Sequence, residues 1–429
     1  MKTILSLAFA VATGVALADP TPPIRPSVCD VKMTQDAASG VATIEYRITD
    51  MEAITTFDVL TNGVSVGDAA INCLVGDINK EVDVGKHTFI WRPEKSFPGH
   101  LFTEGNVKAV VKAWSTKEPP DYIVFYLDCL DASWQVRYYT SEAALPDGGL
   151  ANLKYRNTRL VMRRIPAVDA TFNEPFKMGS PESEVGRNCH RLYETQHDVT
   201  LTKDYYIGIY ELTENQYAYL TGSGAETSAD GLPLSADGMP LLKTSFATLR
   251  GTTKWWPNDK HEVDDGCAIA KMRAKFDNKF AFDLPTEAQW EFACRAGTTG
   301  SFYLPGQLKT NDDEKNETLD KIAWYSHNWG KSPTTVGQLE ANAFGLYDML
   351  GNAYEMCLDQ VQDATTSWDY SSEPATDPVG YGDAKTGFCV ARSCSSWMGP
   401  RMQRCAFRSP VDKTKADAER GFRLCFQLP

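Results

Sequence analysis

The sequence predicts two folds in succession: an all-β sandwich of the immunoglobulin or fibronectin type, followed by a larger α+β domain with little regular secondary structure. The chain has 429 residues, which at roughly 150 residues per domain gives room for two or three domains. Residues 28–128 alternate apolar and polar side chains in short runs, as half-buried strands do. From Arg159 onward this alternation gives way to short strands, two helix-like stretches and long irregular segments.

The first 18 residues have the three parts of a secretory signal peptide. Lys2 is followed by an apolar stretch from Ile4 to Ala18, which ends in small residues before Asp19. A transmembrane anchor is the alternative, but the apolar run is short and no basic stop-transfer flank follows it. The sequence therefore predicts cleavage after Ala18, no transmembrane anchor, and export to the periplasm or the extracellular space.

Residues 19–128 are predicted to form the sandwich. Clear period-two runs lie at 41–48, 87–91 and 107–114, and Asn62-Gly63 is a typical hairpin turn. No catalytic constellation is visible here, so this domain is either an adhesion or spacer module or a folded linker. Residues 129–157 are mixed and polar, and they are predicted to connect the two domains.

The second domain is predicted over residues 158–429. Helices are expected at 264–276 and 285–295, where apolar side chains recur at helical spacing. Thr286 can cap the second helix, because its hydroxyl can accept a hydrogen bond from a backbone amide of the first turn. The remainder is rich in Gly, Asn, Asp and Trp, which predicts a domain dominated by loops.

The charge balance excludes one class of partner. The 43 Lys and Arg residues stand against 56 Asp and Glu residues, the net charge is -13, and no basic patch with interleaved aromatic residues is visible. Nucleic acid is therefore not an expected partner, which leaves a protein or a glycan as the candidate ligand.

Eleven cysteines all follow the predicted cleavage site. In an oxidising compartment their default use is in disulfides, and the odd number leaves at least one thiol outside an intramolecular pair. The sequence has no Cys-x-x-Cys, and its six His residues form no His-x-x-x-His or His-Glu-x-x-His. Residue spacing therefore does not indicate a zinc site.

Six motifs follow one another in the second half of the chain. They are Phe-Lys-Met-Gly-Ser at 176–180, Glu-Thr-Gln-His-Asp-Val at 194–199, Tyr-Glu-Leu-Thr-Glu-Asn-Gln-Tyr at 210–217, Leu-Pro-Thr-Glu-Ala-Gln-Trp-Glu-Phe-Ala at 284–293, Asn-Ala-Phe-Gly-Leu-Tyr-Asp-Met-Leu-Gly-Asn-Ala-Tyr-Glu at 342–355, and Arg-Gly-Phe-Arg-Leu at 420–424. In this order they resemble the formylglycine-generating enzyme family, also called sulfatase-modifying factors, over residues 159–427. The resemblance implies a C-type-lectin-like fold with little regular secondary structure, in a secreted or periplasmic protein.

The best-defined set of oxygen ligands is Asp348-x-x-Gly351-x-Ala353-x-Glu355. Calcium takes six to eight oxygen ligands at about 2.4 Å, and a tight loop can direct two carboxylates and two carbonyls at one point. The resemblance implies that Asp348 and Glu355 bind calcium through their side chains, and Gly351 and Ala353 through their carbonyls. The alternative is that the two carboxylates cap loop amides without a metal.

The resemblance also implies a copper site that this sequence lacks in the family's register. The family's enzymes use two cysteines, in a Cys-x-x-x-x-Cys arrangement, to bind copper(I) and to convert a substrate cysteine to formylglycine with oxygen. Residues 398–403, between the matching landmarks Trp397 and Arg404, contain no cysteine. Ser396 matches the family's active-site serine, and Tyr354 replaces a tryptophan of its oxygen pocket.

Cys389 and Cys394 have the family's spacing, but they precede the Ser396-Trp397 landmark instead of following it. Structural disulfides or buried thiols are the alternative use of this pair, so copper is not expected. The candidate catalytic residues are accordingly Cys389, Cys394, Ser396 and Tyr354.

Two functions follow from these observations. The first is an exported binding module that keeps the family's fold and lacks its copper-binding cysteine pair. The second is an oxygen-dependent oxidoreductase of the same family, acting on a protein cysteine through a diverged site.

Overall fold

The structure is a computed structural model, and it describes most of residues 25–428. The described part leaves out residues 72, 103–105, 168–174, 188–193, 224–237, 255, 258–260, 311–313, 329–332, 362–370 and 381–386. The predicted signal peptide and its cleavage site lie outside the described residues. Within the described residues, none of the helices combines the length and the apolar character needed to cross a bilayer.

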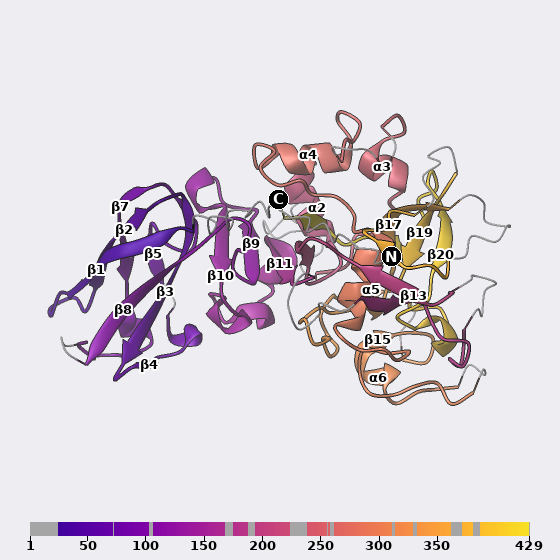
Figure 1. The fold of residues 1–429 in the computed structure, drawn as a ribbon, viewed down its shortest axis with the longest axis horizontal. Coiled ribbons are helices and arrows are strands. Elements are labelled where there is room, and N and C mark those ends of the chain that lie inside the picture. Colours follow the sequence, from indigo (N-terminus) through magenta and orange to yellow (C-terminus); the bar gives the residue numbers. More distant parts are fainter. Residues whose placement is uncertain are drawn as a thin grey trace, which may run out of the picture.

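Two four-stranded sheets form the N-terminal unit, at the indigo end of Figure 1. The first sheet has the strand order β1-β2-β7-β5; in the second, β3 pairs with β4, β6 and β8. The strands are β1 (Ser27–Gln35), β2 (Ala42–Thr49), β3 (Ala53–Thr61), β4 (Val64–Ser65), β5 (Leu74–Gly76), β6 (Glu81–Val82), β7 (Gly85–Trp91) and β8 (Val107–Trp114).

The alternation in the sequence explains how these two sheets pack. In β2, Ala42, Ile44, Tyr46 and Ile48 are all buried, whereas the residues between them are partly or fully exposed. Side chains at every second position of a strand share one face, so this face of β2 meets the facing sheet in a single core. The predicted strands at 41–48, 87–91 and 107–114 correspond to β2, β7 and β8.

A five-stranded antiparallel sheet opens the second unit, and its order is β10-β9-β11-β14-β22. Its strands are β9 (Tyr122–Tyr126), β10 (Val136–Tyr139), β11 (Arg159–Ile165), β14 (Tyr205–Gly208) and β22 (Cys425–Gln427). Figure 1 shows β9, β10 and β11 between the N-terminal sheets and the rest of the molecule.

This sheet differs from the predicted domain boundaries. β9 was expected in the sandwich and β10 in the connecting segment 129–157, but the two form a hairpin that pairs with β11. The apolar strand Tyr122–Tyr126 is buried along most of its length, and it can bury both faces only as an inner strand. The second unit therefore begins near β9, and residues 129–157 are folded onto it.

The remaining elements are short. Three further sheets have the orders β12-β13-β18, β15-β16 and β20-β19-β17-β21. Their strands are β12 (Phe176–Met178), β13 (His197–Thr200), β15 (Ala323–Trp324), β16 (Leu350–Gly351), β17 (Tyr354–Val361), β18 (Ala375–Thr376), β19 (Phe388–Arg392), β20 (Ser409–Asp412) and β21 (Arg420–Gly421). The α-helices are α1 (Lys154–Asn157), α2 (Glu214–Thr221), α3 (Phe246–Arg250), α4 (Ala268–Ala274), α5 (Glu287–Arg295) and α6 (Leu319–Ile322).

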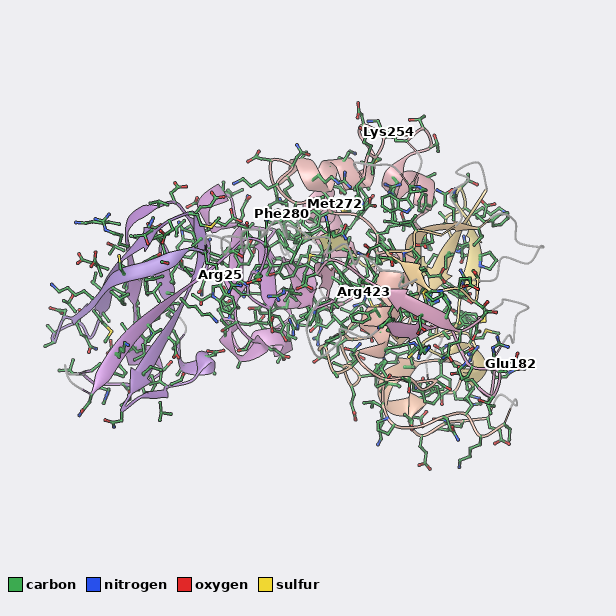
Figure 2. All side chains as sticks on the ribbon, in the orientation of Figure 1. Arg25, Glu182, Lys254, Met272, Phe280 and Arg423 are labelled. Carbon is green, nitrogen blue, oxygen red and sulfur yellow. The ribbon has the colours of Figure 1, made fainter. Side chains whose placement is uncertain are left out.

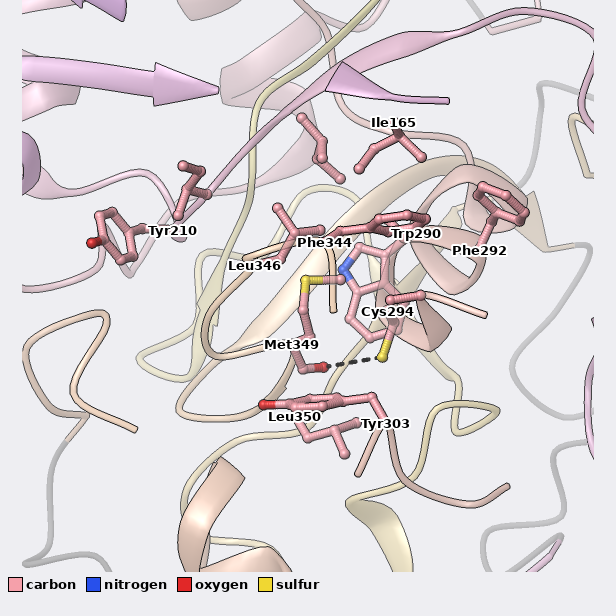
Figure 3. Close-up of a cluster of buried hydrophobic side chains, with 14 of the residues drawn as sticks. Ile165, Tyr210, Trp290, Phe292, Cys294, Tyr303, Phe344, Leu346, Met349 and Leu350 are labelled. Atoms are coloured by element: carbon pink, nitrogen blue, oxygen red, sulfur yellow. Dashed lines mark hydrogen bonds between the residues drawn. The ribbon is translucent and has the colours of Figure 1, made fainter. Parts of the chain in front are cut away.

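Helix α5 begins where the sequence predicts. The Thr286 hydroxyl accepts a hydrogen bond from the Gln289 amide at 3.1 Å, and the Gln289 side chain accepts one from the Thr286 amide at 2.9 Å. This capping box satisfies two amides that a helix start leaves without partners. All nine residues of α5 are buried, and Figure 3 shows Trp290, Phe292 and Cys294 in its apolar surroundings.

Buried charge surrounds the polar side of α5. Arg392 of β19 donates to Glu287 at 2.9 Å and to Glu291 at 2.6 Å, while Arg295 and Arg408 donate to the same two glutamates. All five side chains are almost fully buried. Removing one partner would leave the other charge buried and uncompensated, so these pairs fix how α5 sits against β19.

The cysteines do not bear out the expected disulfides among the described residues. Cys29, Cys129, Cys267, Cys294, Cys357, Cys389, Cys405 and Cys425 are all free thiols in the structure. Cys189 lies outside the described residues.

The second unit is α+β with little regular secondary structure, as the sequence predicts, and it follows an N-terminal region that is all β.

Candidate functional site

The segment from Asp348 to Glu355 contains β16, a tight turn at 352–353 and the start of β17. Asp348, Gly351 and Asn352 all have left-handed backbone angles, with φ of 55°, 84° and 62°. A Cβ atom at Gly351 would lie 2.3 Å from the Trp324 carbonyl oxygen, because β16 runs parallel to β15 at this point. Only glycine fits there, so the turn that presents the predicted calcium ligands depends on Gly351.

Asp348 carries a buried oxygen without a hydrogen-bond partner. Its Oδ2 accepts a hydrogen bond from the Gly337 amide at 2.6 Å, and its Oδ1 accepts none from the residues that the structure describes. Burial raises the pKa of Asp348 to about 6, and the neighbouring Glu355 adds to the rise, whereas the Gly337 amide and Arg423 oppose it. A buried carboxylate oxygen without a donor is costly unless a proton or a cation occupies it.

Glu355 lies close by, but both its oxygens are in use. Arg423 donates to Oε1 at 2.7 Å and to Oε2 at 3.0 Å, and the Trp290 indole donates to Oε2 at 2.7 Å. The remaining guanidinium hydrogens of Arg423 bind backbone carbonyls of residues 208, 209 and 347. Figure 2 shows Arg423 in the interior of the second unit, where its side chain is fully buried.

Glu211 completes the cluster, and the sequence analysis did not assign it a role. Its Oε2 accepts from the Asn352 side chain at 2.6 Å, and its Oε1 accepts from the Ala353 amide at 3.0 Å. Burial and the carboxylates of Asp348 and Glu355 hold the pKa of Glu211 well above its usual range. One signal was available, because Glu211 ends a run of apolar residues that begins at Tyr205.

The cluster has an excess of negative charge. Three buried carboxyl groups, Glu211, Asp348 and Glu355, lie around the Arg423 guanidinium, and Arg156 is a second positive charge that acts on Asp348. A divalent cation would balance this excess, and Asp348 Oδ1 fits as a ligand because no described residue donates a hydrogen bond to it.

The other predicted ligands fit the cation less directly. The Gly351 carbonyl already accepts the Ser393 hydroxyl at 3.1 Å, and Glu355 is engaged by Arg423 and Trp290. Ala353 is buried in the same turn. Across the described part of the chain, no three His, Cys, Asp or Glu side chains converge as a metal-binding group.

The candidate catalytic residues fall into two separate places. The Cys394 thiol donates to the Tyr354 hydroxyl at 3.4 Å, and both residues lie beside the turn described above. Ser396 is fully buried; its amide donates to the Asn352 carbonyl at 3.0 Å, and its hydroxyl has no hydrogen-bond partner. The structure therefore brings Tyr354 and Cys394 into contact, near Ser396.

Cys389 does not join this group. It lies on β19, opposite Gln360, and β19 then runs for three more residues to Arg392 before Cys394 is reached. Those three steps alone span about 10 Å of extended strand. Burial raises the pKa of Cys389 to about 12, so its thiol stays protonated at neutral pH. Cys389 therefore lies within β19, whereas Cys394 lies beyond its end.

A hydrogen-bonded loop, residues 395–403, lies where the family's cysteine pair is expected. In its first turn the Met398 amide donates a hydrogen bond to the Ser395 carbonyl. The Gln403 side chain donates to the same carbonyl at 3.2 Å. Residues Pro400–Met402 form a single 3-10 turn, η7. The loop presents Trp397 with 53% of its surface exposed, although large apolar side chains are mostly buried in this unit.

Comparison with known proteins identifies the family. The sulfatase-modifying factor enzyme 1-like domain matches residues 171–428, which is more than half of the chain. The chain belongs to the sulfatase-modifying factor family. The membership that the six motifs predict is thus confirmed for the C-terminal domain.

Several curated proteins are similar to this sulfatase-modifying factor chain. A chaperone protein LppX from Paenibacillus barcinonensis is 28% identical over 210 residues, covering 42% of this chain and 66% of its own. A formylglycine-generating enzyme from Mycobacterium tuberculosis is 32% identical over 155 residues, covering 33% and 49%. The chain therefore spans between about half and two thirds of the length of these relatives.

Among solved structures, PvdO from Pseudomonas aeruginosa has 22% sequence identity and a TM-score of 0.46, and the match covers 63% of this chain and 95% of PvdO. Treponema denticola variable protein 1 has 23% identity and a TM-score of 0.44, covering 63% and 96%.

Proposed function

We propose that this sulfatase-modifying factor chain is an exported binding module that does not make formylglycine by the copper mechanism. One observation carries this function: residues 398–403, between the landmarks Trp397 and Arg404, contain no thiol. Copper(I) prefers soft thiolate ligands, and residues 398–403 supply none. The oxidoreductase alternative would need Cys389 to leave a buried strand.

A copper assay tests this part of the function. Reduced protein is loaded with copper(I) and incubated with a peptide containing Cys-x-Pro-x-Arg, the motif that the family's enzymes recognise. We expect no stoichiometric copper binding and no loss of peptide mass from oxidation of the cysteine to an aldehyde. Turnover that disappears in both Cys389→Ser and Cys394→Ser would instead establish the oxidoreductase.

The exposed indole of Trp397 supports the binding role. Tryptophan is frequent among residues that dominate binding energy, and a loop that is already closed loses little conformational freedom when a ligand binds. The hydrogen bonds from Met398 and Gln403 to the Ser395 carbonyl hold the loop in that closed form. A relative that carries the name of a chaperone protein favours a polypeptide ligand over a glycan.

Replacing Trp397 tests the surface. We expect Trp397→Ala to weaken binding to immobilised peptide arrays by about 2 kcal/mol, which is roughly thirtyfold in Kd. Leu153→Ala is the matched control, because Leu153 is 49% exposed in the same unit and lies outside the loop. Equal binding by both variants, or binding to glycan arrays only, would contradict a peptide surface at Trp397.

The second part of the proposed function is a calcium ion bound at Asp348. Its role is to stabilise the folded second unit. The unpartnered Asp348 Oδ1 and the excess of buried carboxyl groups support a cation here, with Asp348 as its anchoring ligand. A ligand that binds only the native state stabilises it by about 2.7 kcal/mol at a hundredfold excess over Kd. Calcium would therefore stiffen the turn that carries Asn352 and Tyr354.

Chelation measures this contribution. We expect a chelator to lower the Tm of the wild-type protein, and we expect Asp348→Asn to melt lower and to lose that response. Asp265→Asn, at a fully exposed carboxylate, serves as the control and should keep it. A response that survives in Asp348→Asn would place the calcium elsewhere.

A further inference from the structure

A groove of about 640 Å³ lies where the N-terminal unit meets the second unit. The N-terminal unit lines it with the residues before β1 and with the end of β8, and the second unit lines it with part of β11 and with residues 202–204, just before β14. Segment 115–118, which follows β8, contributes to the lining as well. Neither Asp348 nor Trp397 lines this groove, and its volume is typical of sites for small molecules.

The groove has an excess of positive charge, although the whole chain has a net charge of -13. Arg25 Nη2 lies 3.8 Å from Glu118 Oε1, and Arg164 Nε lies 3.0 Å from Asp204 Oδ2. These two arginines therefore balance the two carboxylates that line the groove. The excess comes from three further cations in the lining, Lys112, Lys117 and Lys203.

The three lysines are accessible to a ligand. All three residues are exposed at the surface, and none of them forms an ion pair with another described residue. The Lys112 ammonium lies 3.5 Å from the centre of the Trp114 ring, and the Trp114 indole donates to the Thr56 hydroxyl at 2.8 Å. An ammonium over an aromatic ring keeps its charge, so Lys112 can still meet an anion on the side away from the ring.

The backbone segments that carry these lysines are held in place. β8 is paired with β3 along its length. The Arg164 side chain donates to the Pro119 carbonyl at 2.5 Å, which ties the end of segment 115–118 to the second unit. The Leu428 amide donates to the Asp204 carbonyl at 3.0 Å, next to Lys203. A ligand therefore orders only the lysine side chains, which limits the entropy lost on binding.

We propose that this groove binds a small organic polyanion with three or more negative charges, carried by carboxylate or phosphate groups. Lys112 meets the ligand from the N-terminal unit, Lys203 from the second unit, and Lys117 from the segment between them. A singly charged anion leaves most of the excess uncompensated, whereas three negative charges match it. A lysine ammonium is a compact point charge without a planar preference, so it accepts either kind of anionic group.

This site depends neither on the peptide-binding surface at Trp397 nor on calcium at Asp348. Polyanions chelate calcium, so the titrations use the full chain after calcium has been removed by chelation and dialysis. Any binding that is then observed cannot arise from withdrawal of calcium from the protein.

Calorimetric titration compares two pairs of probes. Tricarballylate, which has three carboxylates, is compared with its uncharged trimethyl ester, and fructose 1,6-bisphosphate is compared with fructose 6-phosphate. We expect saturable binding of at least one polyanion and at least tenfold weaker binding of its less charged counterpart. The pair that responds shows whether the ligand carries carboxylates or phosphates.

The affinity should fall steeply with salt, because the lysines are exposed and the Debye length shrinks from about 10 Å at 0.1 M to about 3 Å at 1 M. An affinity that is the same at both salt concentrations would contradict binding through these charges.

A double variant, Lys117→Gln with Lys203→Gln, should bind the polyanion at least tenfold more weakly than wild type. Lys108→Gln with Lys279→Gln is the matched control, because it removes the same charge from one exposed lysine before and one after the joining segment, and neither lines the groove. The control should bind like wild type. Equal weakening in the two double variants, equal affinity for a polyanion and its less charged counterpart, or no saturable binding at millimolar concentration would overturn the site.

Discussion

Arg423→Met is expected to lower the free energy of unfolding of the second unit by about 3–5 kcal/mol. The guanidinium is the one cation in contact with Glu355, and it also binds three backbone carbonyls among the described residues. Methionine fills a similar volume but donates no hydrogen bond. Glu355 would then remain buried beside Glu211 and Asp348 without a compensating charge.

Urea denaturation followed by tryptophan fluorescence measures this loss, with Arg420→Met as the matched control. Arg420 is three residues away and pairs with Asp417 at 3.4 Å, but that carboxylate is 44% exposed. Solvent-exposed pairs contribute about 1 kcal/mol or less, so the control should change little. Equal stability of the two variants would show that the Arg423–Glu355 pair does not hold the cluster together.

The second large effect is a pH dependence that originates at Asp359. Burial and the nearby Glu287 raise the pKa of Asp359 from 3.8 to about 7, although the Glu287 amide and Arg408 oppose the rise. The folded chain therefore holds a proton here between about pH 4 and pH 7 that the unfolded chain has released. Below pH 4 the group is protonated in both states and does not change the free energy of unfolding. As the pH rises from about 4 through 7, the free energy of unfolding falls by on the order of 4 kcal/mol in all.

Asp359→Asn isolates this contribution, because an amide oxygen can still accept the Glu287 amide that Asp359 binds at 2.6 Å. The difference in unfolding free energy between the variant and wild type should grow in favour of the variant from pH 4 to pH 8. Asp265→Asn, at a fully exposed carboxylate, should show no such trend. A difference that is constant with pH would mean that Asp359 titrates normally in the folded protein.

Local patterns in the sequence predicted the regular elements well. The alternation at 41–48, 87–91 and 107–114 became β2, β7 and β8, and the helix at 285–295 became α5 with Thr286 as its cap. The helix expected at 264–276 became the shorter α4, Ala268–Ala274. These features depend on neighbours a few residues apart, and sequence spacing reports such neighbours directly.

Long-range contacts could not be predicted in the same way. Glu211 binds Asn352, and Arg423 binds Glu355, although the members of each pair are far apart in the sequence. A charged residue within an apolar run indicates a buried polar contact, but it does not indicate which residue is the partner. The domain boundary differs for a related reason, since a short apolar strand such as β9 could belong to either unit and its pairing with β11 assigns it to the second. The six motifs in order nevertheless identified the family, and the fifth of them contains Asp348.

The order of strands in the five-stranded sheet has a consequence for biosynthesis. β9 and β10 leave the ribosome early, whereas β22, which covers the outer edge of β14, follows β9 by about 300 residues. The sheet therefore has a high contact order. Until residues 425–427 are synthesised, β14 offers an open edge that can pair with another chain. A nascent chain thus stays vulnerable to edge-to-edge aggregation until β22 has been synthesised.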